Sequence, residues 1–248
     1  MLVLSLDTTA RGGSCALVRD EFVVREQAGD ASREQAERLP GELATLLERE
    51  SVALQEIDCF AVATGPGSFT GLRVGIATVQ GLAMAMGKPL IGVSAFDALA
   101  RLCSVVTHEE HGVTPQASPS ESSLHVRGAT RVTAWINAWR GEVFSATYED
   151  GRGLEAPVVA RPEDLLTRLK GQMTIFTGDG AARNQELIRA TLGDAARLTD
   201  PVAPLLAGAI ARLAGEAFRA GRCPPPHAIR AIYVRRPDAA LAGNAGPV

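Results

Sequence analysis

The stretch GPGSFTGLRVGIATVQGLAMAM, residues 65–86, constrains the fold of this chain more than any other. It follows a run of small and β-branched residues at 57–64, which predicts a buried strand. A strand, a glycine-rich turn and a helix form the setting of many phosphate-binding loops. The spacing fits neither common motif, because Gly65, Gly67 and Gly71 give G-x-G-x-x-x-G and the chain's Gly-Lys pair precedes a proline. The turn therefore predicts neither a P-loop nor a dinucleotide site.

The helix expected at 71–86 is apolar on nearly all sides. With residues about 100° apart, one face carries bulky apolar side chains and the adjacent face carries mostly small ones. Such a helix is normally buried nearly all round, and its glycines, Gly75 and Gly81, each cost about 1 kcal/mol relative to alanine. Close approach of a second backbone would offset that cost. This backbone could belong to the same chain, which the pattern alone favours, or to another subunit.

The composition is that of a globular protein and shows no charge bias that would indicate a strongly charged partner. The 248 residues are 46% hydrophobic and 21% charged, with a formal net charge of −3 and no basic block, which argues against independent nucleic-acid binding. The four cysteines form no C-x-x-C pair and are expected to be reduced thiols. The apolar start, MLVLSL, is interrupted by Asp7 and is too short for a signal peptide or a membrane span. We expect a soluble, cytoplasmic protein with no membrane contact.

Both halves of the chain contain the same predicted order of elements, β-β-β-α-β-α. In the first half, strands are expected at 2–7, 14–18, 21–27, 57–64 and 89–93, and helices at 33–50, 71–86 and 94–103. In the second, strands are expected at 131–139, 141–149, 154–160 and 173–178, and helices at 162–170, 181–192 and 203–221. A module duplicated at this scale predicts an α/β protein of two lobes, 1–103 and 131–238, that face a cleft.

Three local features qualify this plan. Pro40 lies inside the amphipathic pattern of 33–50 and is expected to bend or break that helix. Residues 104–130 are polar and rich in Ser, Pro and Glu, which predicts a flexible insertion between the lobes. Residues 239–248 predict a disordered tail.

The layout, with LSLDTT closing the first strand, resembles the actin-like ATPase superfamily, whose members have a ribonuclease H-like fold. A closer resemblance lies in residues 63–100, which are similar to the signature of the TsaB family of bacterial tRNA threonylcarbamoyladenosine biosynthesis proteins. Supporting matches are the motifs LDTT, ERLP at 37–40, WRGEVFSATY at 139–148, TGDGA at 177–181 and YVRRPDA at 233–239.

The resemblance implies a subunit without catalytic or metal-binding residues of its own. Its expected partner is a TsaD-like subunit that carries the metal and ATP and transfers a threonylcarbamoyl group to adenosine 37 of tRNA, and a TsaE-like ATPase is expected to join the complex. The chain is expected to meet tRNA only through this complex and to bind no cofactor tightly, with ATP or ADP possible at the complex interface. Whether the isolated chain forms a homodimer is left open.

The family's dimer face corresponds to the helices at 33–50 and 71–86. The candidate contacts with a partner are Leu39, Leu43, Leu46, Gly71, Gly75, Thr78 and Leu82.

A stand-alone ATPase or small-molecule kinase is the first alternative. Asp7, Thr8 and Thr9 stand where actin-like ATPases hold phosphate and Mg²⁺, although an Asp at the end of a strand can simply form a turn. The chain has Asn137 where the family usually has Asp, and Asn supplies no anionic oxygen to a metal. Asp179 is the one second-lobe carboxylate in a suitable motif, and D-G pairs are mostly turns. We therefore expect a vestigial phosphate loop.

Other sites have weaker signals. A metallopeptidase-like site could use His108 and His111, but their spacing lies in a Pro- and Gly-containing polar segment. Ser68 lacks the G-x-S-x-G context of a nucleophile and is expected to cap the following helix instead. A modest basic cluster is expected to be solvated rather than RNA-bound. It comprises Arg230, Arg235 and Arg236.

Overall fold

The structure is a computed structural model that describes residues 1–104 and 131–235. Its first sheet has the order β3-β2-β1-β4-β5. The first three strands are antiparallel neighbours, and β4 and β5 continue the sheet parallel to β1. The strands are β1 (Leu2–Asp7), β2 (Ser14–Arg19), β3 (Phe22–Ala28), β4 (Cys59–Gly65) and β5 (Leu90–Ser94).

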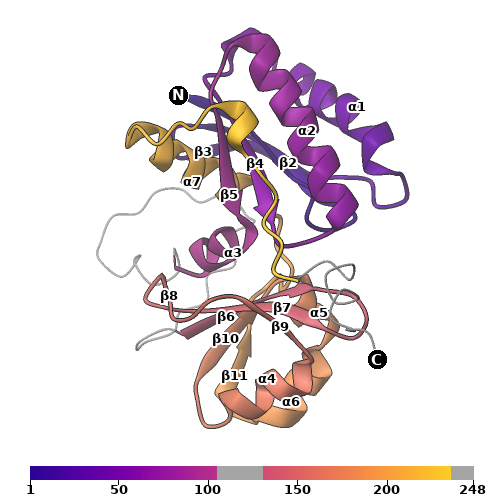
Figure 1. The fold of residues 1–248 in the computed structure, drawn as a ribbon, viewed down its shortest axis with the longest axis vertical. Coiled ribbons are helices and arrows are strands. Elements are labelled where there is room, and N and C mark those ends of the chain that lie inside the picture. The colour runs from indigo at the N-terminus through magenta and orange to yellow at the C-terminus, as the bar shows by residue number, and fades with distance from the viewer. Residues whose placement is uncertain (105–130, 236–248) are drawn as a thin grey trace, which may run out of the picture.

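Alternation along β1 sends successive side chains to the two faces of this sheet. Leu2, Leu4 and Leu6 join the core beneath α1 (Gln35–Arg49) and α2 (Phe69–Met86). Val3 points the other way, into the core that α7 (Ala207–Arg219) covers. Figure 1 shows α1 and α2 side by side on one face of the upper lobe.

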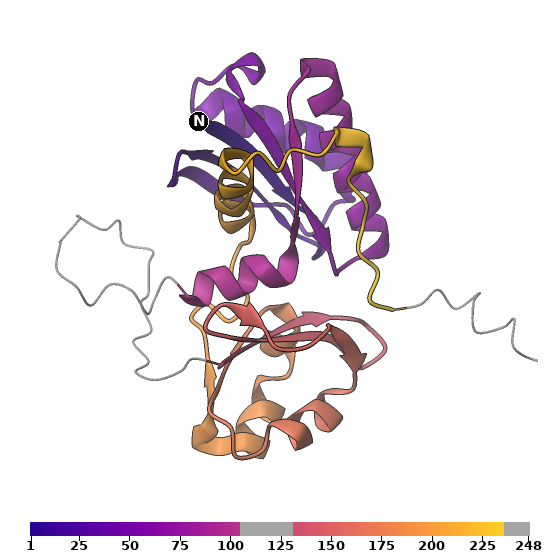
Figure 2. The ribbon, with the colours of Figure 1, turned by 60° about the vertical axis from the view of Figure 1, so that its left-hand side comes forward.

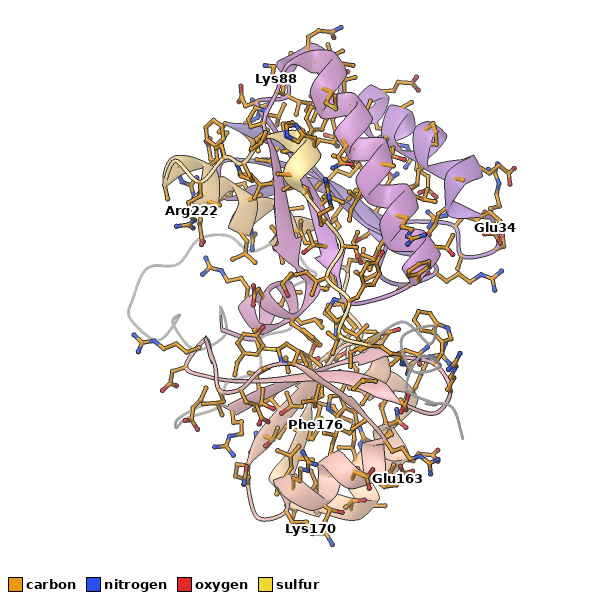
Figure 3. All side chains as sticks on the ribbon, viewed as in Figure 1. Glu34, Lys88, Glu163, Lys170, Phe176 and Arg222 are labelled. Atoms are coloured by element: carbon orange, nitrogen blue, oxygen red, sulfur yellow. The ribbon has the colours of Figure 1, made fainter. Side chains whose placement is uncertain are left out.

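The second sheet repeats this arrangement with the order β11-β10-β6-β7-β8, and β9 pairs with β7. Its strands are β6 (Arg131–Asn137), β7 (Val143–Glu149), β8 (Arg152–Gly153), β9 (Val158–Ala160), β10 (Thr174–Thr177) and β11 (Ala196–Leu198). Its helices are α4 (Pro162–Leu169), α5 (Asp179–Arg183) and α6 (Gln185–Leu192). Phe176 lies inside this lobe, edge-on to Trp135 at 5.1 Å between ring centroids, whereas Glu163 on α4 points outward (Figure 3).

Several expected elements differ in detail. The helix expected at 181–192 is two helices that meet at Asn184, and the strand expected at 154–160 is reduced to β9. β11 was not expected from the sequence. The break predicted at Pro40 is wrong, because α1 is continuous through that residue, which lies on the exposed side of the helix, and the bend stays a prediction. The predicted insertion, after Ser104, and the predicted tail lie outside the described residues.

Each half of the chain gives one helix to the other half. α3 (Ala95–Ser104) contacts β6 of the second sheet, and α7 covers the first sheet along β1, β2, β4 and β5. Figure 2 shows α3 lying between the two lobes. One continuous apolar core therefore runs through both sheets and both exchanged helices. The division of the chain into lobes 1–103 and 131–238 stays a prediction. Core residues from both ranges pack against one another.

This exchange predicts that the lobes unfold together. Ile210 is fully buried in the shared core, on the part of α7 that covers the first sheet. Ile210→Ala should lower the free energy of unfolding by about 2–5 kcal/mol. The fluorescence of Trp135 and Trp139, both in the second lobe, should shift its urea midpoint together with far-UV circular dichroism. A fluorescence midpoint that stays in place while circular dichroism shifts would show that the lobes are independent.

Candidate functional site

The hairpin between β1 and β2 holds the residues expected to form a phosphate loop. Asp7 is buried at the end of β1, and its Oδ1 accepts hydrogen bonds from the backbone N–H of Thr9 at 2.9 Å and from the Thr9 hydroxyl at 2.7 Å. Gly13 has a φ of +61°, and a Cβ at this position would lie 2.2 Å from the Asp7 carbonyl oxygen. The two arms of the hairpin are therefore in close contact, and position 13, just before β2, requires glycine.

Thr8 points away from the hairpin and into α2. A Cβ on Gly75 would lie 2.2 Å from the Thr8 hydroxyl oxygen, and one on Gly71 would lie 2.4 Å from the Thr8 carbonyl oxygen. The small-residue face of α2 thus admits a backbone from the same chain. The interpretation of this face as internal packing is confirmed.

Both ends of the glycine-rich turn are tied to this hairpin. The Ser68 hydroxyl accepts a hydrogen bond from Gly71 N–H at 3.2 Å, which confirms the predicted cap of α2. The Ser68 backbone N–H donates to the Thr9 carbonyl oxygen at 2.7 Å. The turn therefore orders the helix and holds the hairpin at the same time.

Side chains from α1 hold the hairpin from a third side. Gln35 donates to the carbonyl oxygen of Ala10 at 3.0 Å. The guanidinium of Arg38 donates to the carbonyl oxygens of Arg11 and Gly12 at 3.0 and 2.5 Å, and it is paired with Glu42 at 2.5 Å. Arg38 is buried although it lies on a surface helix, and the amphipathic pattern of 33–50 gave no sign of this. The ERLP motif that contains Arg38 was the only available signal.

Three carboxyl groups lie near one another where the two lobes meet. Burial raises the pKa of Asp7 above its ordinary value of 3.8, and the nearby Asp179 adds to this rise while the Thr9 hydrogen bonds oppose it. Burial also raises the pKa of Asp179, at the start of α5, although the Asn137 N–H donates to it at 3.0 Å. Burial raises the pKa of Glu26, and the hydrogen bond from the Gly208 N–H at the start of α7 opposes this rise. The charged form of each group is thus disfavoured.

These groups fit a phosphate–metal site poorly. The Thr9 hydroxyl is turned to Asp7, and the Thr8 hydroxyl is buried against α2. The Asn137 side chain accepts from the Trp139 N–H at 3.1 Å and supplies no anionic oxygen. Among residues 1–104 and 131–235, no group of three His, Cys, Asp or Glu side chains is placed to hold a metal. His108 and His111 lie outside the described residues, and nucleotide binding at Asp7, Thr8 and Thr9 stays a prediction.

Five of the seven expected partner contacts are buried inside the chain. Leu39, Leu43 and Leu46 are core residues at 0–5% exposure, and the glycines at 71 and 75 pack on the hairpin. These five residues face the first sheet and Thr8, so their burial argues against contact with a partner. Thr78 and Leu82 are half-buried, and Leu82 packs against the same core.

The opposite face of α2 is exposed and carries little charge. Only 33% of the helix is buried within the molecule. The helix is long and apolar enough to cross a membrane, but core helices of soluble proteins meet the same criterion. A Cβ on Gly81 would meet nothing within 4 Å. The exposed residues after the first are Thr70, Arg73, Ala77, Gly81, Met84 and Ala85. α1 is packed beside this helix and exposes the small residues Ala36, Pro40, Gly41 and Ala44.

Two cavities are lined mainly by polar side chains. One, of about 490 Å³, opens between the end of β3 and α1 and is lined by Arg33, Arg38 and Arg49 together with Glu37 and Glu42. The other, of about 500 Å³, lies on the polar surface where α5 meets α6. Neither includes a residue that the sequence singled out for chemistry.

Comparison with known proteins decides the family. The model for TsaD, tRNA N6-adenosine threonylcarbamoyltransferase, matches residues 26–161. The tRNA threonylcarbamoyladenosine biosynthesis protein TsaB of Escherichia coli (strain K12) is 33% identical over 187 residues, which cover 72% of each chain. The chain belongs to the TsaB family. A solved structure of YeaZ from Pseudomonas aeruginosa has a TM-score of 0.67 and 28% identity, and covers 94% of this chain and 99% of that one.

A more distant structure extends the likeness at the level of the fold. The activator of the 2-hydroxyisocaproyl-CoA dehydratase from Clostridium difficile has a TM-score of 0.56 at 12% identity, over 90% of this chain and 97% of that one. The α/β fold with two mixed sheets that was expected from the sequence is confirmed. The activator was solved with bound ADPNP, and this likeness concerns the fold alone.

The packing of Thr8 on α2 leads to a matched pair of substitutions. Gly75→Ala should destabilise the protein by about 1–3 kcal/mol, because its Cβ would overlap the Thr8 side chain. Gly81→Ala, on the open face of the same helix, should stabilise it by about 0.5–1 kcal/mol. Thr8→Ala should recover part of the Gly75→Ala loss in urea titrations of the double variant. Equal effects of the two glycine substitutions would contradict this contact.

The buried carboxyl of Asp7 leads to a pH prediction. Because its pKa in the folded state is raised above 3.8, its contribution to stability is fully present below that pH and is lost as the pH rises through the folded pKa. Asp7→Asn keeps an oxygen that can accept from Thr9 and removes the charge. Asp7→Asn should therefore have a higher free energy of unfolding than the parent chain at about pH 7, and this difference should disappear at about pH 4. Urea titrations would measure this, with the exposed Asp194→Asn as control.

Proposed function

We propose that this TsaB-family chain is a non-catalytic subunit that binds and activates a TsaD-like transferase in the formation of N6-threonylcarbamoyladenosine at position 37 of tRNA. It works in the cytoplasm, and a TsaE-like ATPase joins the complex. The E. coli relative is named for tRNA threonylcarbamoyladenosine biosynthesis, and the family model that matches over half of the chain is that of the transferase itself. These likenesses support the proposal for the pathway and the partner.

The observation that carries the proposal is the exposed face of α2. Ala77, Gly81 and Ala85 follow one another at every fourth residue, so their small side chains form one stripe along the helix. Small residues let a second helix approach closely, and the neighbouring Met84 is an exposed apolar side chain that such a helix would cover. A face of this kind favours a helix of a partner subunit over solvent.

The closed hairpin supports a role without catalysis. The hydroxyls of Thr8 and Thr9 are turned inward, and the charged form of Asp7 is disfavoured. A phosphate would have to displace these contacts before it could bind. If ATP or ADP takes part, we propose that it binds at the junction with the partner, with residues that the partner supplies. In the absence of a partner, the same face of α2 is where a homodimer would form.

Partner binding can be tested with one matched pair of variants. Ala77→Leu places a bulky side chain in the middle of the stripe, and Ala190→Leu makes the same change on the exposed face of α6 in the other lobe. With purified TsaD-like protein from the same cells, Ala77→Leu should weaken binding at least about tenfold, or 1.4 kcal/mol, in isothermal titration calorimetry. Ala190→Leu should bind like the parent chain.

Two results would overturn the proposal. The first is equal affinity of all three proteins for the TsaD-like subunit. The second is ATP turnover by the isolated chain that is lost in Asp7→Ala, which would favour the stand-alone ATPase or kinase instead.

A further inference from the structure

A block of exposed aromatic and arginine side chains lies at the first turn of α2. Phe69 is 53% exposed and Tyr233 is 47% exposed, and their ring centroids are 5.4 Å apart. The guanidinium of Arg73 lies over the Phe69 ring at 3.8 Å from the centroid, and its Nε donates to the Tyr233 hydroxyl at 3.3 Å. Residues 160 positions apart in the chain thus form one exposed surface, which we call the aromatic–arginine block.

The segment that carries Tyr233 continues to the second lobe. Ile232 N–H donates to the Thr64 carbonyl oxygen at 2.7 Å, and Arg235 forms an ion pair with Glu142 in the turn between β6 and β7. Tyr233 and Arg235 are two residues apart, so at most about 7 Å separates their Cα atoms. The Arg235 side chain spans the remaining distance to the turn. Figure 1 shows this last part of the chain running from the upper lobe to the lower one in front of the sheets.

The same turn presents a third large aromatic side chain. Trp139 is 47% exposed, and both Trp139 and Arg140 have positive φ values, +57° and +55°. This backbone region is uncommon for residues other than glycine and is an outlier for a bulky side chain. Trp139 and Arg140, with Gly141, form the tight turn of the β6–β7 hairpin, in which the Glu142 N–H donates to the Trp139 carbonyl oxygen at 2.9 Å. The indole ring is exposed on this turn.

Two arginine side chains are placed at this surface. Arg73 lies on the Phe69 ring, and Arg235, two residues beyond Tyr233, is paired with Glu142. Proteins that bind single-stranded nucleic acid combine such arginines, which meet phosphates or stack on bases, with aromatic rings on which successive bases stack. Exposed aromatic and arginine side chains are also enriched at protein interfaces, so a contact with a protein is the outcome that the test must exclude.

We propose that the aromatic–arginine block and Trp139 form a contact surface for unpaired RNA bases, of the kind found in a tRNA loop. The inference rests on the proposed function only in its choice of RNA over other nucleic acid. It replaces the expectation that the chain meets tRNA only through its partner, and it includes Arg235 in the surface.

Fluorescence anisotropy of the full chain tests this proposal. The probe is a labelled, unstructured RNA of about 12 nucleotides, within the site sizes of single-strand binders, and an RNA duplex of the same composition is the comparison. Phe69→Ala and Tyr233→Ala should each weaken binding to the single strand by about tenfold, as expected for the loss of one stacked base. Phe22→Ala removes another exposed phenyl ring, on β3, and should bind like the parent chain.

The outcomes distinguish this proposal from the proposed function. No single-strand binding by the parent chain, equal loss in Phe22→Ala, or tighter binding of the duplex would overturn the RNA surface, even if the chain binds its TsaD-like partner through Ala77. Loss of partner binding in Phe69→Ala with unchanged RNA affinity would identify the block as a protein contact and would also overturn it. Single-strand binding that depends on Phe69, by a chain that binds no partner, would support the RNA surface and remove the proposed function.

Discussion

The contact between Thr8 and the glycine face of α2 is the constraint on which the rest of the first lobe depends. Any side chain at Gly71 or Gly75 would overlap its neighbours at the hairpin, so α2 must turn this face toward the hairpin. This rotation places Ile76 and Val79 over the sheet and leaves the stripe from Ala77 to Ala85 outside. The packing of the hairpin against one face of α2 therefore also determines which residues lie on the exposed face.

The exchange of α3 and α7 between the lobes argues for a rigid body. A hinge needs a boundary that few packed contacts cross, whereas here one apolar core joins both sheets. The start of α7 is also fixed at this junction, because the Ser14 hydroxyl accepts from the N–H groups of Leu206 and Ala207 at 3.3 and 3.1 Å. Detaching α7 from the first sheet would break these bonds and expose Ile210 and its neighbours. A rigid chain of this kind suits a subunit that supports another protein.

Sequence periodicity predicted most elements but not their environment. The alternation in β1 and the apolar run in β4 gave strands within two residues of those observed, because burial on both faces leaves a clear pattern. The sequence could not show which face of α2 is buried, because Gly75 and Gly81 have similar surroundings in the sequence. The two glycines differ only in the structure, where Thr8 packs against Gly75. Arg38 was missed for a similar reason. Its partners are backbone carbonyl oxygens of the hairpin, which no side-chain pattern reveals.

One helix carries both proposed surfaces, and this relates them in space. α2 has 18 residues and is about 27 Å long at 1.5 Å per residue, with Phe69 and Arg73 in its first turns and the small-residue stripe from Ala77 onward. A partner helix along the stripe would thus end within a few turns of the aromatic–arginine block. If an RNA loop lies on that block, the partner's catalytic site must face the same end of α2, where the two lobes meet. An accessory subunit could in this way hold the substrate of the enzyme that it binds, without taking part in the reaction.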